Sequence, residues 1–273
     1  MSIPENFILL HQGEEHIRQQ SLSFVETDQA LLLHFDVLER SINLIEYFSR
    51  AWETQDEDDI TLQLLGVRLF NSSAASINLL LSGYYQASAS LGRDVLETSF
   101  LVDLLANDRQ AVARWRSASE EERKKQFGPI HVRMALDARD GHTSKARASH
   151  YALLSKLASH PTPEGFRLLR PGSGQLAKIG PFFNAETFGA VLSELAKVVI
   201  PAAGHFRRHF DPRAHVLMDF EVLLHFIEGA ARWFERFFGR PVNKKEIEDA
   251  RATLQIAQKL ARRDVARKVV HRG

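Results

Sequence analysis

The chain of 273 residues contains no cysteine. This absence excludes disulfide bonds, cysteine-ligated zinc, iron–sulfur clusters and thiol catalysis, and it fits a reducing compartment. An excess of one charge is also lacking, because 35 Lys and Arg residues face 34 Asp and Glu residues, which leaves a net charge of +1. Proteins that bind nucleic acids or acidic membranes usually carry a strong positive excess, so neither partner is expected.

One long uncharged stretch invites a membrane-spanning interpretation. Residues 70–92 carry no charge, but six serines make this stretch too polar to enter lipid unaided. The N-terminal sequence MSIPENFILLHQGEEH has no early positive charge and only a four-residue apolar run, so no signal peptide is predicted. We therefore predict a cytoplasmic protein in which residues 70–92 form a buried helical segment.

Several catalytic motifs are missing as well. The sequence has no Gly-x-x-x-x-Gly-Lys phosphate loop, no Gly-x-Gly-x-x-Gly after a strand, no Gly-x-Ser-x-Gly elbow and no His-Glu-x-x-His. Glu-x-x-His, which di-iron helical bundles carry on two helices, does not occur either. No cofactor is predicted, and whether the protein is an enzyme stays open.

What the sequence does contain is helical periodicity. Apolar residues recur at steps of three and four almost everywhere, which predicts an all-α multi-helix bundle. We expect a single domain over 1–273, with a core over about 60–240 and peripheral helices over 1–25 and 243–273. Residues 161–183 hold four of the nine prolines and four of the fifteen glycines, which predicts a long irregular loop. Loops of this length are usually functional or mobile.

Capping residues predict where helices begin and end. Ser119 and Glu122 have the spacing of a capping box. Asp58 or Asp59 can cap the helix that follows them, and Pro212 suits the first turn of another. The expected helices cover residues 4–20, a segment from Thr27, 60–107 with a bend near 71–73 or Gly83, a segment ending at Gly141, 143–159, 185–209, 211–239 and 244–271.

The stretch GYYQASASLGRDVLETSFLVDLL, residues 83–105, places charges on an otherwise apolar helix. Arg93, Asp94 and Glu97 fall in one narrow sector, and a helix that is apolar on most sides is normally central. These charges should be half-buried, and half-buried charges need partners. Three interpretations stay open: a structural polar network, a strip that faces a ligand, or an exposed pair.

A second polar set lies in HYALLSKLASHPTPEGF, residues 150–166. Tyr151, Ser155 and Ser159 follow one helical face, and His160 stands at the helix end beside a proline. His160 either caps the last carbonyl groups or acts as an acid–base group that faces the long loop. Together the two sets predict a polar cleft in which Arg93 holds a carboxylate or phosphate. Its expected ligand-binding residues are Arg93, Glu97, Tyr151, Ser155 and His160.

These two motifs, with KIGPFFNAETFGAVLSELAKVV after them, resemble a family of uncharacterised bacterial helical proteins. The family carries a domain of unknown function with an Arg-x-x-x-Glu helix and a Tyr-x-x-x-Ser…His-Pro segment. The resemblance spans roughly residues 65–210 and implies a helical bundle and a bacterial source. It maps the same five residues onto the family's polar positions, and it implies no activity.

Histidines near residue 210 suggest two further sites. His205 and His209, four residues apart, are weak candidates for metal ligands that Glu221, His225 and Glu228 would complete, or they are surface residues of an amphipathic helix. Arg208 and His215 have the spacing of the HEPN superfamily of nucleases and toxins, although the arginine and histidine content makes such a match expected by chance.

We therefore expect a protein that binds a small anionic ligand or a protein partner in the polar cleft. The alternative is a HEPN-like, metal-independent ribonuclease of a phage-defence or toxin system, with Arg208 and His215 as catalytic residues across a homodimer. Nucleic acid is an expected partner only in that case.

Overall fold

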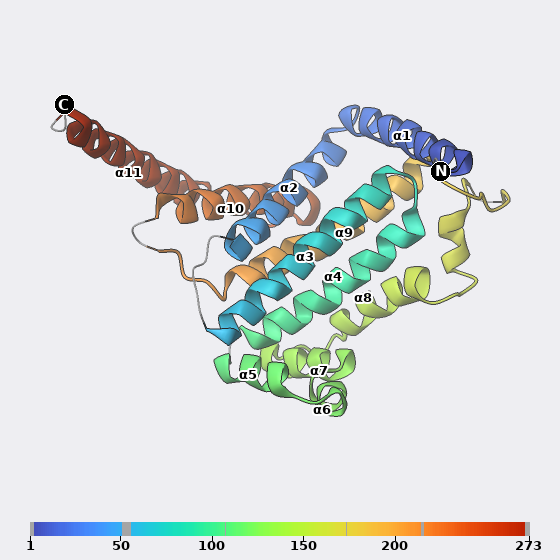
Figure 1. Ribbon diagram of the computed structural model, residues 1–273, viewed down its shortest axis with the longest axis horizontal. Helices are drawn as coiled ribbons and strands as arrows, with labels where there is room; N and C mark the ends of the chain where they lie inside the picture. The colour runs from blue at the N-terminus through green and yellow to red at the C-terminus, as the bar shows by residue number, and fades with distance from the viewer. Residues whose placement is uncertain (1–2, 51–55, 107, 173, 214–215, 271–273) are drawn as a thin grey trace.

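The computed structural model describes residues 3–50, 56–106, 108–172, 174–213 and 216–270, and of residues 109, 246 and 260–270 it describes only the backbone. This part of the chain is all-helical and contains no strand, which confirms the predicted all-α class (Figure 1). The helices are α1 Glu5–Glu26, α2 Gln29–Arg50, α3 Glu57–Leu81, α4 Tyr85–Leu105, α5 Arg109–Ser117, α6 Glu120–Phe127, α7 Pro129–Asp140, α8 Ala146–Leu154, α9 Ala185–Arg207, α10 Leu217–Phe238 and α11 Lys244–Val270. A π-helical turn, η1 Ser155–Ser159, continues α8, and a 3-10 turn, η2 Gly165–Leu169, lies in the long loop.

Helices α2, α3, α4 and α9 pack against one another as the central bundle (Figure 1). Leu38, Leu69, Val95, Leu192 and Phe206 are among its fully buried side chains, one or more from each helix. Two of these helices, α3 and α9, are long and apolar enough to cross a membrane by length and composition, and both contribute buried faces to the bundle. The expectation that residues 83–105 form a central helix is confirmed by α4, which packs on α3 and on α9.

The chain leaves the bundle after α4 and returns at α9. Helices α5, α6 and α7 lie beyond one end of α3 and α4, and α8 runs back along α4 (Figure 1). At the other side of the molecule, α10 packs on α2 and α11 extends away along α10 (Figure 1). The excursion α5–α8 therefore stands beside the charged sector of α4.

The helix expected over 60–107 is two helices, because the chain turns at Gly83. Gly83 has a left-handed φ of 80°, and a Cβ built there would lie 2.3 Å from the carbonyl oxygen of Phe182. Only glycine fits both constraints, so the hairpin between α3 and α4 depends on it. The expected bend at Gly83 is thus a complete break, whereas α3 passes through residues 71–73 without interruption.

Two cap predictions are confirmed and two are wrong. Ser119 and Glu122 form the reciprocal capping box, and Gly141 ends α7 with a φ of 66°. The cap of α3 is Asp56, which accepts from the backbone N–H groups at positions 58 and 59, so Asp58 and Asp59 are the capped residues. Pro212 begins no helix, because α10 starts at Leu217.

The late start of α10 has a physical reason in a buried carboxylate. Asp219 accepts from the backbone N–H of Arg213 at 2.8 Å and from its guanidinium at 2.7 and 2.9 Å. The Tyr47 hydroxyl donates to the same carboxylate at 2.6 Å. These bonds hold the backbone of Arg213 outside the helix. They also lower the pKa of Asp219 to about 2, against the opposing effect of its burial.

Candidate functional site

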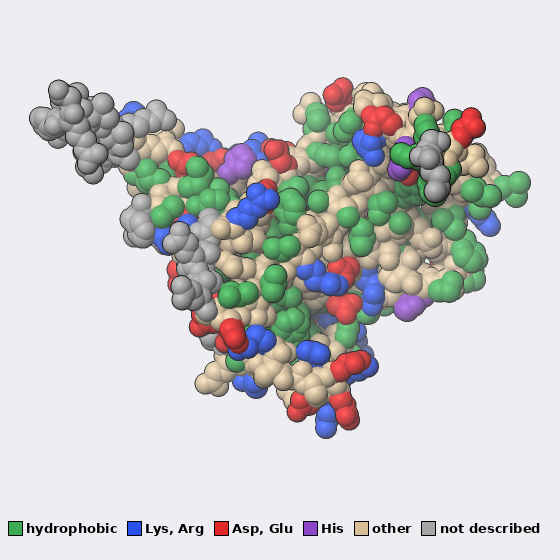
Figure 2. Space-filling view, viewed as in Figure 1, with side chains coloured by type: hydrophobic (Ala, Val, Ile, Leu, Met, Phe, Trp, Pro, Cys, Tyr) green, Lys and Arg blue, Asp and Glu red, His purple; other side chains and the backbone are tan. Residues whose placement is uncertain are grey.

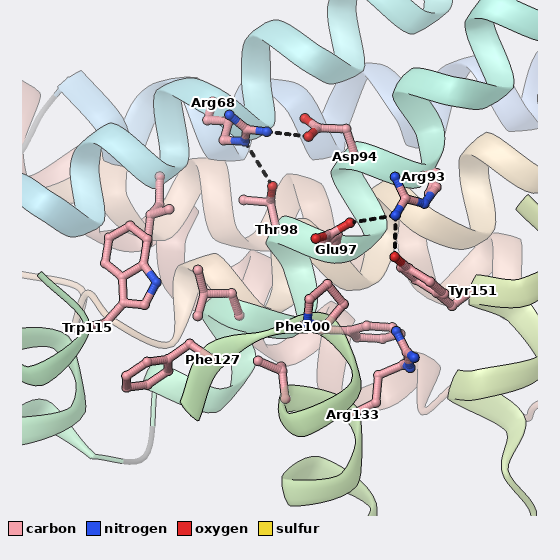
Figure 3. Close-up of a pocket in the computed structure, with 14 residues that line it drawn as sticks. Arg68, Arg93, Asp94, Glu97, Thr98, Phe100, Trp115, Phe127, Arg133 and Tyr151 are labelled. Carbon is pink, nitrogen blue, oxygen red and sulfur yellow. Dashed lines mark hydrogen bonds and ion pairs between the residues drawn. The ribbon is translucent and has the colours of Figure 1, made fainter. Parts of the chain in front are cut away.

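A cavity of about 480 Å³ opens between the α3–α4 pair and the excursion α5–α8. Its size is that of a small-molecule site. Charged residues of both signs gather on the surface where α3 and α4 meet the excursion (Figure 2). We call this cavity the cleft. Among the side chains that line it are Arg68 of α3, Arg93, Asp94, Glu97 and Phe100 of α4, Trp115 of α5, Phe127 of α6, Arg133 of α7 and Tyr151 of α8 (Figure 3).

The sequence of α4 explains why its charges face the cleft. Val95, Leu96 and Val102 are buried in the bundle, so the polar sector with Arg93 and Glu97 is left on the side of the excursion. The spacing of four residues brings these two side chains together, and Arg93 Nη2 lies 3.2 Å from a carboxylate oxygen of Glu97.

Arg93 is the centre of a polar network that joins α4 to α8 and η1. Its Nε donates to the Ser155 hydroxyl at 2.9 Å. Its Nη2 donates to the Tyr151 hydroxyl (Figure 3). The side chain of Arg93 is only 24% exposed, so these partners replace water that the guanidinium has lost. Arg93, Glu97, Tyr151 and Ser155 are therefore brought together.

His160 is not brought to this network. It is exposed, and it is not among the residues that line the cleft. Its backbone N–H donates to the carbonyl of Ser155 at 3.1 Å, which ends the π-helical turn. Residues of the loop 161–183 do not line the cleft either, and side chains of α5, α6 and α7 form the wall opposite α3 and α4.

Sequence reasoning missed Arg68, although a signal for it was present. Arg68 is the only charged residue between Asp59 and Arg93, so a partner on a neighbouring helix was to be expected. Its Nη2 donates to Asp94 and its Nε to the Thr98 hydroxyl at 3.2 Å. Asp94 also accepts from Ser72 at 2.8 Å, so this carboxylate is fully engaged.

The second missed residue, Arg133, has no partner of opposite charge. Its guanidinium carbon lies 4.0 Å from the centroid of the Tyr151 ring, and that of Arg93 lies 4.7 Å from the same centroid. Nη1 of Arg133 is buried without a hydrogen-bond partner, and within the described residues no carboxylate is paired with this side chain. A buried donor left unsatisfied costs about 1–3 kcal/mol, and more when it is charged.

The charges of the cleft do not cancel. The three guanidinium groups of Arg68, Arg93 and Arg133 face the two carboxylates of Asp94 and Glu97. Each carboxylate is paired with one arginine, Asp94 with Arg68 and Glu97 with Arg93. The cleft is therefore one negative charge short of neutrality, and the unmatched cation is Arg133.

The histidines considered as metal ligands are each hydrogen-bonded to a different group. His205 Nδ1 is hydrogen-bonded to Ser99 at 3.0 Å, and His209 Nε2 donates to the carbonyl of Val102 at 2.9 Å. His225 is bonded to Arg40 at 2.9 Å. Within the described residues, no group of three histidine, aspartate or glutamate side chains is placed to hold a metal ion.

A Ser–His–Asp arrangement occurs beside α9, but it is closed to a substrate. His205 is bonded to Ser99 and lies 3.7 Å from Asp103, while Ser99 is only 1% exposed. Burial lowers the pKa of His205, against the opposing effect of the Asp103 charge. Arg208 donates to Asp103 at 2.9 Å, and His215, its expected catalytic partner, lies outside the described residues.

Comparison of the chain with protein-family models, with curated proteins and with solved structures finds no match. The resemblance to a bacterial helical family therefore stays a prediction. A function for this chain has to be argued from the geometry and charge of the cleft.

Proposed function

We propose that the protein binds a small organic anion in the cleft, between α4, α7 and α8. The observation that carries this proposal is Arg133, a half-buried cation with a fully buried Nη1 and no carboxylate partner. A ligand anion would supply the missing charge and accept hydrogen bonds from the part of the Arg133 guanidinium that lines the cleft.

Arg133 is well suited to this role because its orientation is fixed before a ligand arrives. Its guanidinium packs on the Tyr151 ring, and the hydroxyl of Tyr151 is in turn held by Arg93. A planar guanidinium that is already oriented can bind a carboxylate or phosphate through two parallel hydrogen bonds. It loses little side-chain entropy when it does so.

Arg93 would assist at the same tyrosine ring. It is bound to Ser155, Tyr151 and Glu97, so its role is to position Tyr151 and to add positive potential. Of the residues expected from the sequence, Arg93, Glu97 and Tyr151 would thus lie in the site. Ser155 would lie behind it.

The test compares Arg133→Met with Arg240→Met. Both variants remove a guanidinium packed on an aromatic ring, since Arg240 lies 4.9 Å from the Phe234 ring, away from the cleft. In NMR titrations with benzoate, Arg133→Met should bind about tenfold to hundredfold more weakly than the wild type. Arg240→Met should bind as the wild type does. Equal affinity of both variants, or no binding by the folded wild type, would overturn the proposal.

The ribonuclease alternative is supported by one observation, the pairing of Arg208 with the buried Asp103 beside two further arginines, Arg139 and Arg147. Under this alternative a bacterial, cytoplasmic homodimer would cut RNA. Cleavage of RNA by the wild type that Arg208→Ala abolishes, with the fold retained by circular dichroism, would favour it. An inert wild type would exclude it.

A further inference from the structure

We infer that the ligand of the cleft is a monocarboxylate carried on a flat apolar group, as in an aryl carboxylate. This inference rests on the proposed function. It follows from two properties of the cleft that anion binding alone does not require, namely the size of its charge deficit and the placement of Trp115 and Phe127 away from Arg133.

The charge deficit favours a single negative charge. Asp94 and Glu97 each have their own arginine, and one guanidinium remains. A monoanion on Arg133 would make the cleft neutral, whereas a phosphate dianion would leave an excess negative charge beside Asp94 and Glu97 in a partly desolvated site. The planar fork of one free arginine also matches the two oxygens of one carboxylate.

The other end of the cleft holds aromatic side chains, with Arg68 and Thr98, which are hydrogen-bonded to each other, above them in Figure 3. Trp115 and Phe127 are half-buried side chains of α5 and α6, and Phe100 and Val132 close the wall between them and Arg133. Figure 3 places Trp115 and Phe127 at one side and Arg93, Arg133 and Tyr151 at the other. A ligand that fills the cleft would present its anion to one end and an apolar body to the other.

The shape and size of this end favour a flat group. Aromatic walls interact best with a ring stacked on them or set edge to face. A volume of about 480 Å³ is far more than a two-carbon acid needs, so an anion such as acetate would leave the aromatic walls wet. A ring system attached to the carboxylate would fill that space and strengthen the ion pair by excluding water.

The experiment is an NMR titration of the full chain with acetate, benzoate, 2-naphthoate and phenyl phosphate at pH 7.5. We expect benzoate to bind about tenfold or more tightly than acetate, 2-naphthoate to bind at least as tightly as benzoate, and phenyl phosphate to bind more weakly than benzoate. Equal affinity for acetate and the aryl acids, still lost in Arg133→Met, would overturn this inference and leave the proposed function standing. Tighter binding of phenyl phosphate would likewise reject the monocarboxylate.

Variants at the apolar end provide the second measurement. Trp115→Leu should lower the ratio of 2-naphthoate to acetate affinity about tenfold, because it removes one wall of the cleft. Phe238→Leu is the matched control, since Phe238 is a 49% exposed aromatic residue on α10. If Trp115→Leu does not fold, as judged by circular dichroism, Phe127→Leu makes the same comparison. An unchanged ratio in the folded variant would contradict the inference.

Discussion

Two charged clusters lie along α4, and they differ in how completely their charges are matched. Near the end of the helix, the buried carboxylate of Asp103 accepts from Arg139 at 3.0 Å and from Arg208 at 2.9 Å, with His205 nearby. Beside the middle of α4, Arg133 of α7 lines the cleft, and its buried Nη1 has no hydrogen-bond partner. The first cluster has all the partners it needs, and the second does not.

This difference distinguishes a residue that supports the fold from a residue of the proposed ligand site. A buried charge that has all its partners stabilises the fold once formed, and breaking it leaves uncompensated charge behind. A buried donor without a partner costs stability, and in a native protein it calls for an explanation such as a bound ligand, a water molecule or strain. Asp103 therefore belongs to the bundle, whereas Arg133 belongs to the proposed ligand site.

The largest expected effect is that of Asp103→Ala. It would leave Arg139 and Arg208 without their shared carboxylate and should lower the free energy of unfolding by about 3 kcal/mol. Urea denaturation followed by circular dichroism measures this loss, and benzoate binding by the folded fraction should persist. A loss below about 1 kcal/mol would mean that solvent screens this cluster and that the comparison between the two clusters is wrong.

A second matched group, His34, should make stability depend on pH. Its Nδ1 accepts from the indole N–H of Trp233 at 2.8 Å, and burial lowers its pKa to about 4. The unfolded chain takes up a proton near pH 6.5, so the stability from neutral His34 is complete above pH 6.5 and is lost as the pH falls towards 4. The free energy of unfolding should fall by about 3 kcal/mol across this window.

The control for this pH profile is His34→Gln, which keeps an acceptor for Trp233 but does not titrate. His205, whose pKa burial also lowers, contributes in the same direction. Denaturation midpoints between pH 4 and 6.5 should therefore show a shallower slope in the variant rather than none. A slope as steep as that of the wild type would assign the effect to other groups.

Arg133→Met should have the opposite sign from Asp103→Ala. It removes a buried unsatisfied donor and keeps an apolar stem against Tyr151, so stability should be unchanged or raised by up to about 1 kcal/mol. The same variant should lose anion binding. A thermal or urea transition that falls well below that of the wild type would show that Arg133 supports the fold instead.

The smallest expected effect on stability is that of Glu97→Gln. The Glu97 side chain is 37% exposed, and removal of its pair with Arg93 should cost less than about 0.5 kcal/mol. Because the cleft becomes more positive, its affinity for benzoate should rise about twofold to fivefold at low salt. Unchanged or weaker binding would indicate that Glu97 itself contacts the ligand.

The sequence predicts those parts of this site that depend on contacts within one helix. It does not predict the contacts between helices. The sector with Arg93 and Glu97 follows from helical spacing, and Tyr151 with Ser155 follows from the same rule on α8. Nothing local indicates that Arg133 packs on Tyr151, because that contact depends on how α7 lies against α8. Likewise, helical periodicity alone does not place Trp115 in the wall of the cleft.

Local sequence patterns also predict the fold only in part. The all-α class and the capping box at Ser119 follow from local patterns, and the break at Gly83 was expected only as a bend. The cap at Asp56 was missed because the acidic run offers several equivalent carboxylates. The helix start at Pro212 was wrong because Asp219 and Tyr47 override a local preference with long-range hydrogen bonds.

The two walls of the cleft belong to different parts of the fold. One wall is the α3–α4 face of the central bundle, and the other is the excursion α5–α8, which packs against that face (Figure 1). Under the proposed function, exchange of half-buried side chains such as Trp115 and Phe127 would alter which acid fits while the α3–α4 wall stayed the same. The excursion would then carry both Arg133 and the side chains that select the acid, so selectivity could diverge without change in α3 and α4.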